Sequence, residues 1–66
     1  MEITVNGKKN DYSGPPLVTG LLESLGISSR TVVVERNLRV VPRSELEKEP
    51  VQDGDAIEVI RFVGGG

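Results

Sequence analysis

The sequence predicts an α+β domain, a mixed sheet of four or five strands with one main helix packed on one face. Three observations predict it: short segments of alternating apolar residues typical of strands, one apolar stripe at helical spacing, and an Asn-Gly hairpin signal near the start. Leu, Ile, Val and Phe make up about a third of the 66 residues, well above the roughly 20% below which disorder is expected. We therefore expect one domain that folds alone.

The first two strands should form a hairpin. Ile3 and Val5 share one face by the two-residue period of a strand. Asn6-Gly7 follows, and both residues tolerate the positive φ that a tight hairpin turn requires. The chain should return over Lys8 to Tyr12 as a weaker edge strand, since lysines discourage pairing with other sheets.

The main helix is predicted from about Leu17 to Leu25, followed by a glycine suited to a helix C-terminus, Gly26. Its apolar stripe is formed by leucines at helical spacing, with Val18 at the border. The stripe consists of Leu17, Leu21, Leu22 and Leu25.

A third strand is expected over Thr31 to Glu35, which is rich in β-branched residues. Val32 and Val34 should share its buried face. A turn at Arg36-Asn37 would then lead into a short return strand over Leu38 to Val41, which Pro42 ends.

The last part of the chain combines a short helix, a turn and the longest strand signal. Ser44 and Glu47 fit a capping box and predict one helical turn near Leu46. Asp53-Gly54-Asp55 predicts a tight turn. The strand signal covers Ala56 to Val63.

This order of elements places one helix over one face of a mixed sheet. The helical connection requires at least one parallel strand pair. The architecture is the β-grasp, or ubiquitin-like, fold. We assign residues 1–63 to the β-grasp domain and residues 64–66 to a flexible C-terminal glycine tail.

Composition excludes several function classes. The chain has no Cys and no His, which excludes a disulfide scaffold, a thiolate nucleophile, a His base and the common zinc sites. The net charge is −2 with both signs interspersed, so no footprint for nucleic acid or an anionic membrane is present. We expect a cytoplasmic protein that is a monomer when free, with no bound metal or cofactor.

Charged side chains are the first place to look for chemistry. The carboxylates around the Asp-Gly-Asp turn are interpreted as a solvated acidic face, with Asp53 and Asp55 fixing the turn at Gly54. Four arginines could form a cationic surface, but scattered, solvated positions are the simpler interpretation. They are Arg36, Arg39, Arg43 and Arg61.

The last strand suggests a docking surface for a partner protein. If Ile57 and Val59 pack under the helix, alternation leaves Ile60 and Phe62 exposed on the other face. Val33, on the minority face of its own strand, is expected to join them. Grouped exposed apolar residues mark interaction sites; the alternative is that residues 36–56 cover them.

The three terminal glycines cannot pack, and ordering them is entropically costly. They extend the chain by roughly 10 Å and, lacking side chains, can enter a narrow channel. Gly66 would present its carboxylate to another enzyme, with Gly64 and Gly65 giving access. By themselves the glycines favour the interpretation as a frayed end, and only the rest of the sequence gives them a function.

The whole chain resembles the ThiS family, the sulfur carriers of thiamine (thiazole) biosynthesis. The resemblance rests on five segments: Ile3–Gly7, Val34–Asn37, Val40–Arg43, Val51–Val59 and Val63–Gly66. It implies that an E1-like adenylating enzyme of the ThiF type uses Mg-ATP to adenylate Gly66. Sulfur supplied through a cysteine desulfurase would then give a thiocarboxylate, which a thiazole synthase of the ThiG type consumes.

In this interpretation the carrier performs no catalysis, and Ile60, Phe62 and Val33 dock its partners. Three alternatives stay open. The molybdopterin-synthase small subunit shares the fold and the glycine end, although its chain is usually longer. A ubiquitin-like protein modifier and a β-grasp interaction module with an incidental tail are the others.

Overall fold

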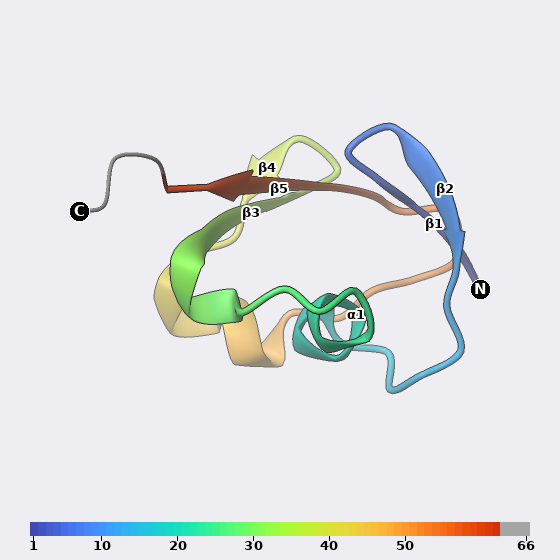
Figure 1. The fold of residues 1–66 in the computed structure, drawn as a ribbon, viewed down its shortest axis with the longest axis horizontal. Coiled ribbons are helices and arrows are strands. Elements are labelled where there is room, and N and C mark those ends of the chain that lie inside the picture. The colour runs from blue at the N-terminus through green and yellow to red at the C-terminus, as the bar shows by residue number, and fades with distance from the viewer. Residues whose placement is uncertain (63–66) are drawn as a thin grey trace.

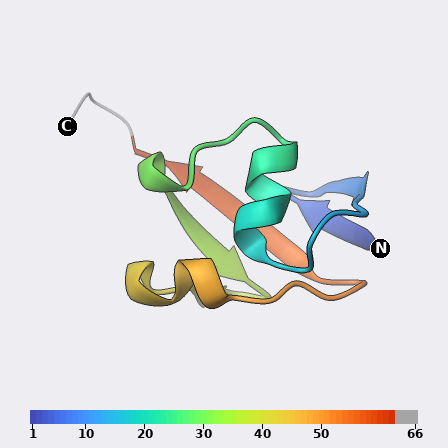
Figure 2. The ribbon, with the colours of Figure 1, turned by 90° about the horizontal axis from the view of Figure 1, so that it is seen from below.

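The computed structural model describes residues 1–62, which form a sheet layered on helices (Figure 1). The sheet lies on one side, with the helix α1 and the 3-10 helix η2 together on the other (Figures 1 and 2). In chain order the elements are β1 (Glu2–Val5), β2 (Lys8–Asp11), α1 (Val18–Ser24), η1 (Ser29–Thr31), β3 (Val32–Arg36), β4 (Arg39–Val40), η2 (Arg43–Lys48) and β5 (Ala56–Arg61).

The five strands are arranged in the order β2-β1-β5-β3-β4. The strands β1 and β5 pair in parallel, and the other neighbours pair antiparallel. This mixed sheet with one main helix on one face confirms the predicted β-grasp fold. The strand β5 is central: it starts beside β1 and extends past it along β3, toward the end of the molecule far from the N-terminus (Figure 1).

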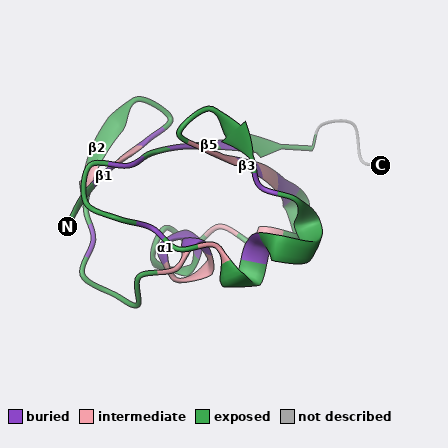
Figure 3. Cartoon of the chain, turned by 180° about the vertical axis from the view of Figure 1, so that it is seen from behind, coloured by how far each residue is buried: buried purple, intermediate pink, exposed green. Residues whose placement is uncertain are grey.

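The core lies between the sheet and the helices (Figure 3). Strand alternation is confirmed, because every apolar residue assigned to the inner face is buried there. These residues are Ile3, Val5, Val32, Val34, Ile57 and Val59.

The predicted helix stripe is partly wrong. The buried residues of α1 are Val18, Leu21 and Leu22, which follow the i, i+3, i+4 spacing of one helix face. Leu17 is extended, with φ −132° and ψ 148°, and it forms a bridge to Pro50. Leu25 ends the helix and is 36% exposed.

Two local predictions in the second half also need correction. The turn between β3 and β4 is Asn37-Leu38, one residue later than expected, and both residues have positive φ. The helical segment near Leu46 exists as η2, but its N-cap is Pro42 and no side chain caps it. The capping box is therefore wrong, because the chain enters η2 one residue before Ser44.

Candidate docking face and carrier end

Val33 and Ile60 lie on the sheet face that points away from α1, because each alternates with buried neighbours along its strand. Phe62 follows the end of β5. Ile60 is 48% exposed and Phe62 61% exposed. Val33 is half-buried and pairs directly with Ile60 across the antiparallel β3–β5 ladder. The fold thus brings Val33 and Ile60 together from segments far apart in the sequence. We call Val33, Ile60 and Phe62 the docking face.

Gly64, Gly65 and Gly66 lie outside the described residues, as does Val63 at the end of the predicted last strand. The structure shows where the chain leads toward them. The strand β5 ends at Arg61, and the Phe62 N–H donates to the carbonyl of Thr31 at 3.2 Å. The first of the glycines, Gly64, therefore lies two residues after Phe62 in the sequence.

Two further apolar residues belong to this region and were not predicted. Val40 is 61% exposed and pairs with Glu35. It also lines a mainly apolar depression that Val33 and Phe62 share with core residues such as Val34 and Leu46. Leu38 in the adjoining turn is 88% exposed. The sequence could have indicated that Val40 is exposed, because it alternates with Val41, which is buried. The exposure of Leu38 was missed because this residue was assigned to a strand.

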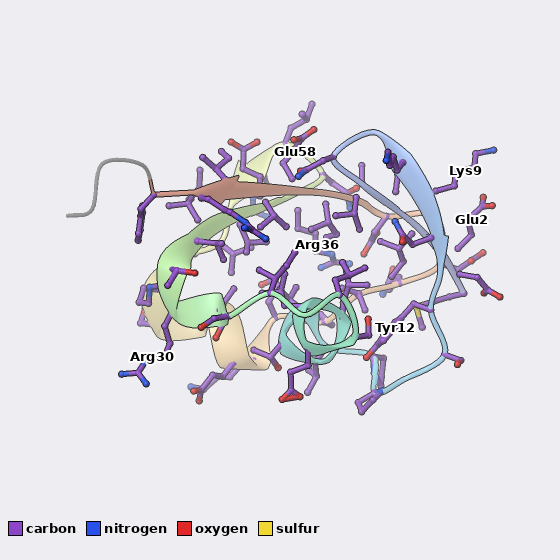
Figure 4. All side chains as sticks on the ribbon, in the orientation of Figure 1. Glu2, Lys9, Tyr12, Arg30, Arg36 and Glu58 are labelled. Atoms are coloured by element: carbon purple, nitrogen blue, oxygen red, sulfur yellow. The ribbon has the colours of Figure 1, made fainter. Side chains whose placement is uncertain are left out.

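A partly buried ion cluster fixes the start of β5 on the opposite side of the sheet. The Arg36 side chain points toward the helices (Figure 4), donates from Nε to Asp55 at 2.8 Å and from Nη1 to Glu49 at 3.2 Å. Asp55 also accepts the Asn37 Nδ2–H at 3.0 Å and the Gln52 backbone N–H at 2.8 Å. Asp55 thus has partners for both carboxylate oxygens.

The cluster shifts the pKa of both its central groups. The hydrogen bond to Asp55, followed by that to Glu49, raises the pKa of Arg36. Burial raises the pKa of Asp55, but hydrogen bonds from Asn37, Arg36 and Gln52 outweigh it, so this pKa lies below its ordinary value. Both groups are held in their charged forms, which suits a structural ion pair rather than an acid or base catalyst.

The remaining charged residues singled out from the sequence have mostly structural contacts. Asp53 accepts the Glu2 backbone N–H at 2.6 Å. Arg43 donates to the carbonyls of Ser29 at 2.5 Å and Val32 at 2.6 Å, and so ties η2 to the start of β3. The interpretation of the arginines as solvated is therefore wrong for Arg36, which is partly buried in ion pairs. Arg43 is exposed as expected, although its guanidinium also bonds to backbone carbonyls 11 and 14 positions away in the sequence.

Metal and membrane sites are two further possibilities for the described part of the chain. Residues 1–62 contain no group of three or more acidic side chains placed to hold a metal ion. Within the same residues, no helix has the length and apolar character to cross a membrane.

Comparisons with known proteins agree on one family. A model of the ThiS family matches residues 3–66. The chain is 35% identical over 49 residues, covering 74% of each chain, to the sulfur carrier protein ThiS of Bacillus subtilis. The crystal structure of the thiamine biosynthesis protein ThiS from Geobacter metallireducens superposes with a TM-score of 0.82 at 40% identity, over 100% of both chains.

A different kind of relative is much longer. The whole chain is 44% identical to part of a protein named thiazole synthase from Paramagnetospirillum magneticum, of which it spans 20%. It likewise spans 20% of a thiazole synthase from Magnetococcus marinus at 39% identity. On the family match and the shared fold, the chain belongs to the ThiS family.

Proposed function

We propose that this protein carries sulfur as a thiocarboxylate on Gly66 and delivers it to a thiazole synthase for thiamine biosynthesis. The observation that carries this proposal is the ThiS-family match, which extends through residue 66 and so includes the three terminal glycines. The protein would act as a co-substrate of its partner enzymes, without catalytic residues or a bound cofactor of its own, in the cytoplasm.

The proposed chemistry begins at a carboxylate that is a poor electrophile. An E1-like adenylating enzyme of the ThiF type would join Gly66 to the AMP part of Mg-ATP and release pyrophosphate. Cationic groups of that enzyme would stabilise the charge that develops on the phosphates. The acyl-adenylate then has AMP as its leaving group.

Sulfur would enter from a persulfide that a cysteine desulfurase supplies. The terminal persulfide sulfur attacks the acyl carbon of Gly66, AMP leaves, and an acyl disulfide forms. A thiol then reduces that disulfide and releases the thiocarboxylate. Because Gly64 and Gly65 have no side chains, they would allow the reacting end to enter a narrow active site.

The geometry of the described residues supports a carrier that partner proteins bind close to its C-terminal end. Ile60 is exposed on β5, and Phe62 is exposed just after that strand, two residues before Gly64. A partner that binds the docking face would therefore hold the chain just before its reacting end, which limits the positions that Gly66 can reach.

Intact mass spectrometry tests the proposal. The purified protein is incubated with Mg-ATP, its adenylating enzyme, a cysteine desulfurase, cysteine and a thiol reductant. We expect the mass gain that replaces one oxygen by sulfur, located on Gly66 by fragmentation. A variant lacking Gly66 should keep the circular dichroism spectrum of the parent and show no gain. A parent protein that gains no sulfur with a competent enzyme would refute the carrier function.

The same material separates the pathways. The thiocarboxylate form is supplied either to thiazole synthase with its substrates or to a molybdopterin-synthase large subunit with its precursor. We expect thiazole formation only. Turnover with the molybdopterin precursor alone would assign the carrier to the other pathway.

A further inference from the structure

The turn between β3 and β4 holds a leucine in an unfavourable position. Leu38 has φ +69°, a left-handed conformation that is unfavourable for an L-residue with a Cβ. Its side chain is 88% exposed, so no burial in this structure offsets that cost. In the other hairpin the corresponding second turn residue is Gly7, at φ +83°, where no such cost arises.

A second unfavourable feature lies next to this turn. Glu35 and Glu58 are directly opposite each other on β3 and β5, and like charges in that arrangement repel. The ion pairs of residues 1–62 use Asp11, Glu49 and Asp55 as their acids. Glu58 projects from the sheet face that points away from α1 (Figure 4). Glu58 is exposed and Glu35 half-buried, and neither forms an ion pair within residues 1–62.

Both features are continuous with the docking face. Glu35 lies between Glu58 and Val40 in the strand registers. Val40 lines one apolar depression with Val33 and Phe62. A partner that covers the docking face and extends along β3 toward the turn would reach the carboxylate pair and then Leu38.

We propose that the hairpin β3–β4 is a second contact region for the thiazole synthase, which rests on the function proposed above. Leu38 inserts into an apolar pocket of the synthase, and a basic side chain of the synthase lies between Glu35 and Glu58. In the free carrier these residues reduce stability; in the complex, burial of the leucine and pairing of the carboxylates reverse both effects.

Two observations favour the synthase as the occupant. An equivalent region, 44% identical, forms 20% of a protein named thiazole synthase, so in that protein the hairpin is held at high effective concentration near the rest of a synthase chain. A second copy of the carrier fits poorly, because a symmetric contact on this face brings two carboxylate pairs together.

The first experiment measures binding and stability on the same variants. Affinity for the purified thiazole synthase of the same source is measured by isothermal titration calorimetry with the parent protein, Leu38→Gly and Leu38→Met. We expect Leu38→Gly to bind on the order of tenfold more weakly, as for a central interface anchor, and to unfold at the same or a higher Tm. Leu38→Met should bind within about threefold of the parent, because it keeps an apolar side chain of similar volume.

A matched control uses Leu25, the other exposed leucine, which ends α1 on the helix side. Leu25→Ala should not change the affinity. Binding of Leu38→Gly as tight as that of the parent would overturn the proposal, as would a lower Tm for this variant, which would assign Leu38 a structural role. Self-association of the parent that Leu38→Gly abolishes, without synthase binding, would also overturn it.

The second experiment tests the charge of the partner. Glu35→Gln with Glu58→Gln should weaken synthase binding several-fold and reduce its dependence on salt. Glu45→Gln with Glu47→Gln changes the net charge by the same amount, but on η2. This control should leave the affinity for the synthase and its salt dependence unchanged. Equal effects of the two double variants would overturn the proposed pairing.

These outcomes are separable from those of the carrier function. If the parent acquires sulfur on Gly66 but no variant alters synthase binding, only the hairpin proposal fails. If the parent acquires no sulfur yet loses synthase binding on Leu38→Gly, the carrier function fails and the hairpin contact stands.

Discussion

The two hairpins of this protein use the same turn and anchor it to the same strand. In each, an asparagine with positive φ opens the turn, Asn6 at +49° and Asn37 at +51°. The Asn6 side chain accepts the Val59 N–H at 2.7 Å and donates to the Val59 carbonyl at 3.2 Å. The Asn37 side chain accepts the Ala56 N–H at 2.9 Å and donates to Asp55 at 3.0 Å. Both turns are thereby tied to β5 or to the residue before it.

The hairpins differ at the next residue and at the neighbouring sheet edge. The first has Gly7 and then two exposed lysines on β2, which suit a turn and a protected edge. The second has Leu38 and then exposed Val40 on β4, although a type I′ turn and an edge strand favour neither. The first hairpin therefore has residues suited to the free domain, and the second has residues suited to a contact with a partner.

The largest expected effect comes from the ion cluster that anchors only the second turn. Asp55→Asn removes the charged acceptor of Arg36 and Asn37, and we expect a loss of about 2–3 kcal/mol in the free energy of unfolding. Urea unfolding at neutral pH measures it. Amide hydrogen exchange should quicken more in residues 36–41 than in residues 5–8.

A control for this prediction lies two residues away. Asp53→Asn changes the same charge in the same turn, but its only side-chain contact in the described residues is an exposed bond to the Glu2 N–H. We expect a loss below about 1 kcal/mol. Equal losses for Asp53→Asn and Asp55→Asn would show that the cluster does not distinguish the hairpins.

The same cluster predicts how stability depends on pH. The pKa of Asp55 is lowered in the folded protein from its ordinary value of 3.8, so the unfolded chain binds its proton first as pH falls. The stabilisation is complete above that ordinary value and is lost as pH falls through the folded pKa. The difference in stability between the parent and Asp55→Asn should therefore shrink in acid; a constant difference down to the lowest pH would contradict the role of this carboxylate.

The next largest effect is expected from a substitution of Gly7 in the first turn. An added Cβ at Gly7 meets no atom within 4 Å, so Gly7→Leu tests the backbone conformation alone. We expect a loss of about 1–2 kcal/mol, the cost of a left-handed L-residue. Thermal and urea unfolding measure it. No loss would mean that this turn tolerates leucine and that Leu38 stores no strain.

The reciprocal change should have the opposite sign. Leu38→Gly relieves the same conformation and removes a side chain that is 88% exposed, while glycine adds freedom to the unfolded chain. We expect a net gain of about 0.5–1 kcal/mol. Leu38→Asn, which tolerates positive φ, should gain a similar amount. If both variants are less stable than the parent, the leucine contributes contacts in the free protein.

The sequence predicted the inner faces of the strands better than it predicted this turn. Burial on one face leaves a period of two in the sequence, which identified Ile57 and Val59 as core and Ile60 as exposed. No comparable pattern in the sequence marks the turn at Asn37-Leu38. Glycine is the expected second residue of such a hairpin turn, whereas leucine is typical of a helix or a strand. Its position depends on β5, to which Asn37 is bonded.

Local sequence patterns could not predict the ion cluster either. Arg36 meets Glu49 and Asp55 at separations of 13 and 19 residues, and only the completed sheet brings them together. Likewise, the choice between Leu17 and Val18 for the buried face depended on the bridge from Leu17 to Pro50, which takes Leu17 out of the helix.

The smallest expected effect concerns the carboxylates beside the second turn. Glu35→Gln with Glu58→Gln removes a like-charge pair that the strand register places directly opposite, and it should stabilise the free domain by a few tenths of a kcal/mol. The gain should vanish at high salt, since screening already weakens the repulsion in the parent. Urea unfolding at low and high salt measures it, with Glu45→Gln and Glu47→Gln as the control for net charge. A gain that persists at high salt would point to packing instead of charge, and the second hairpin would then differ from the first only at its leucine and its valine.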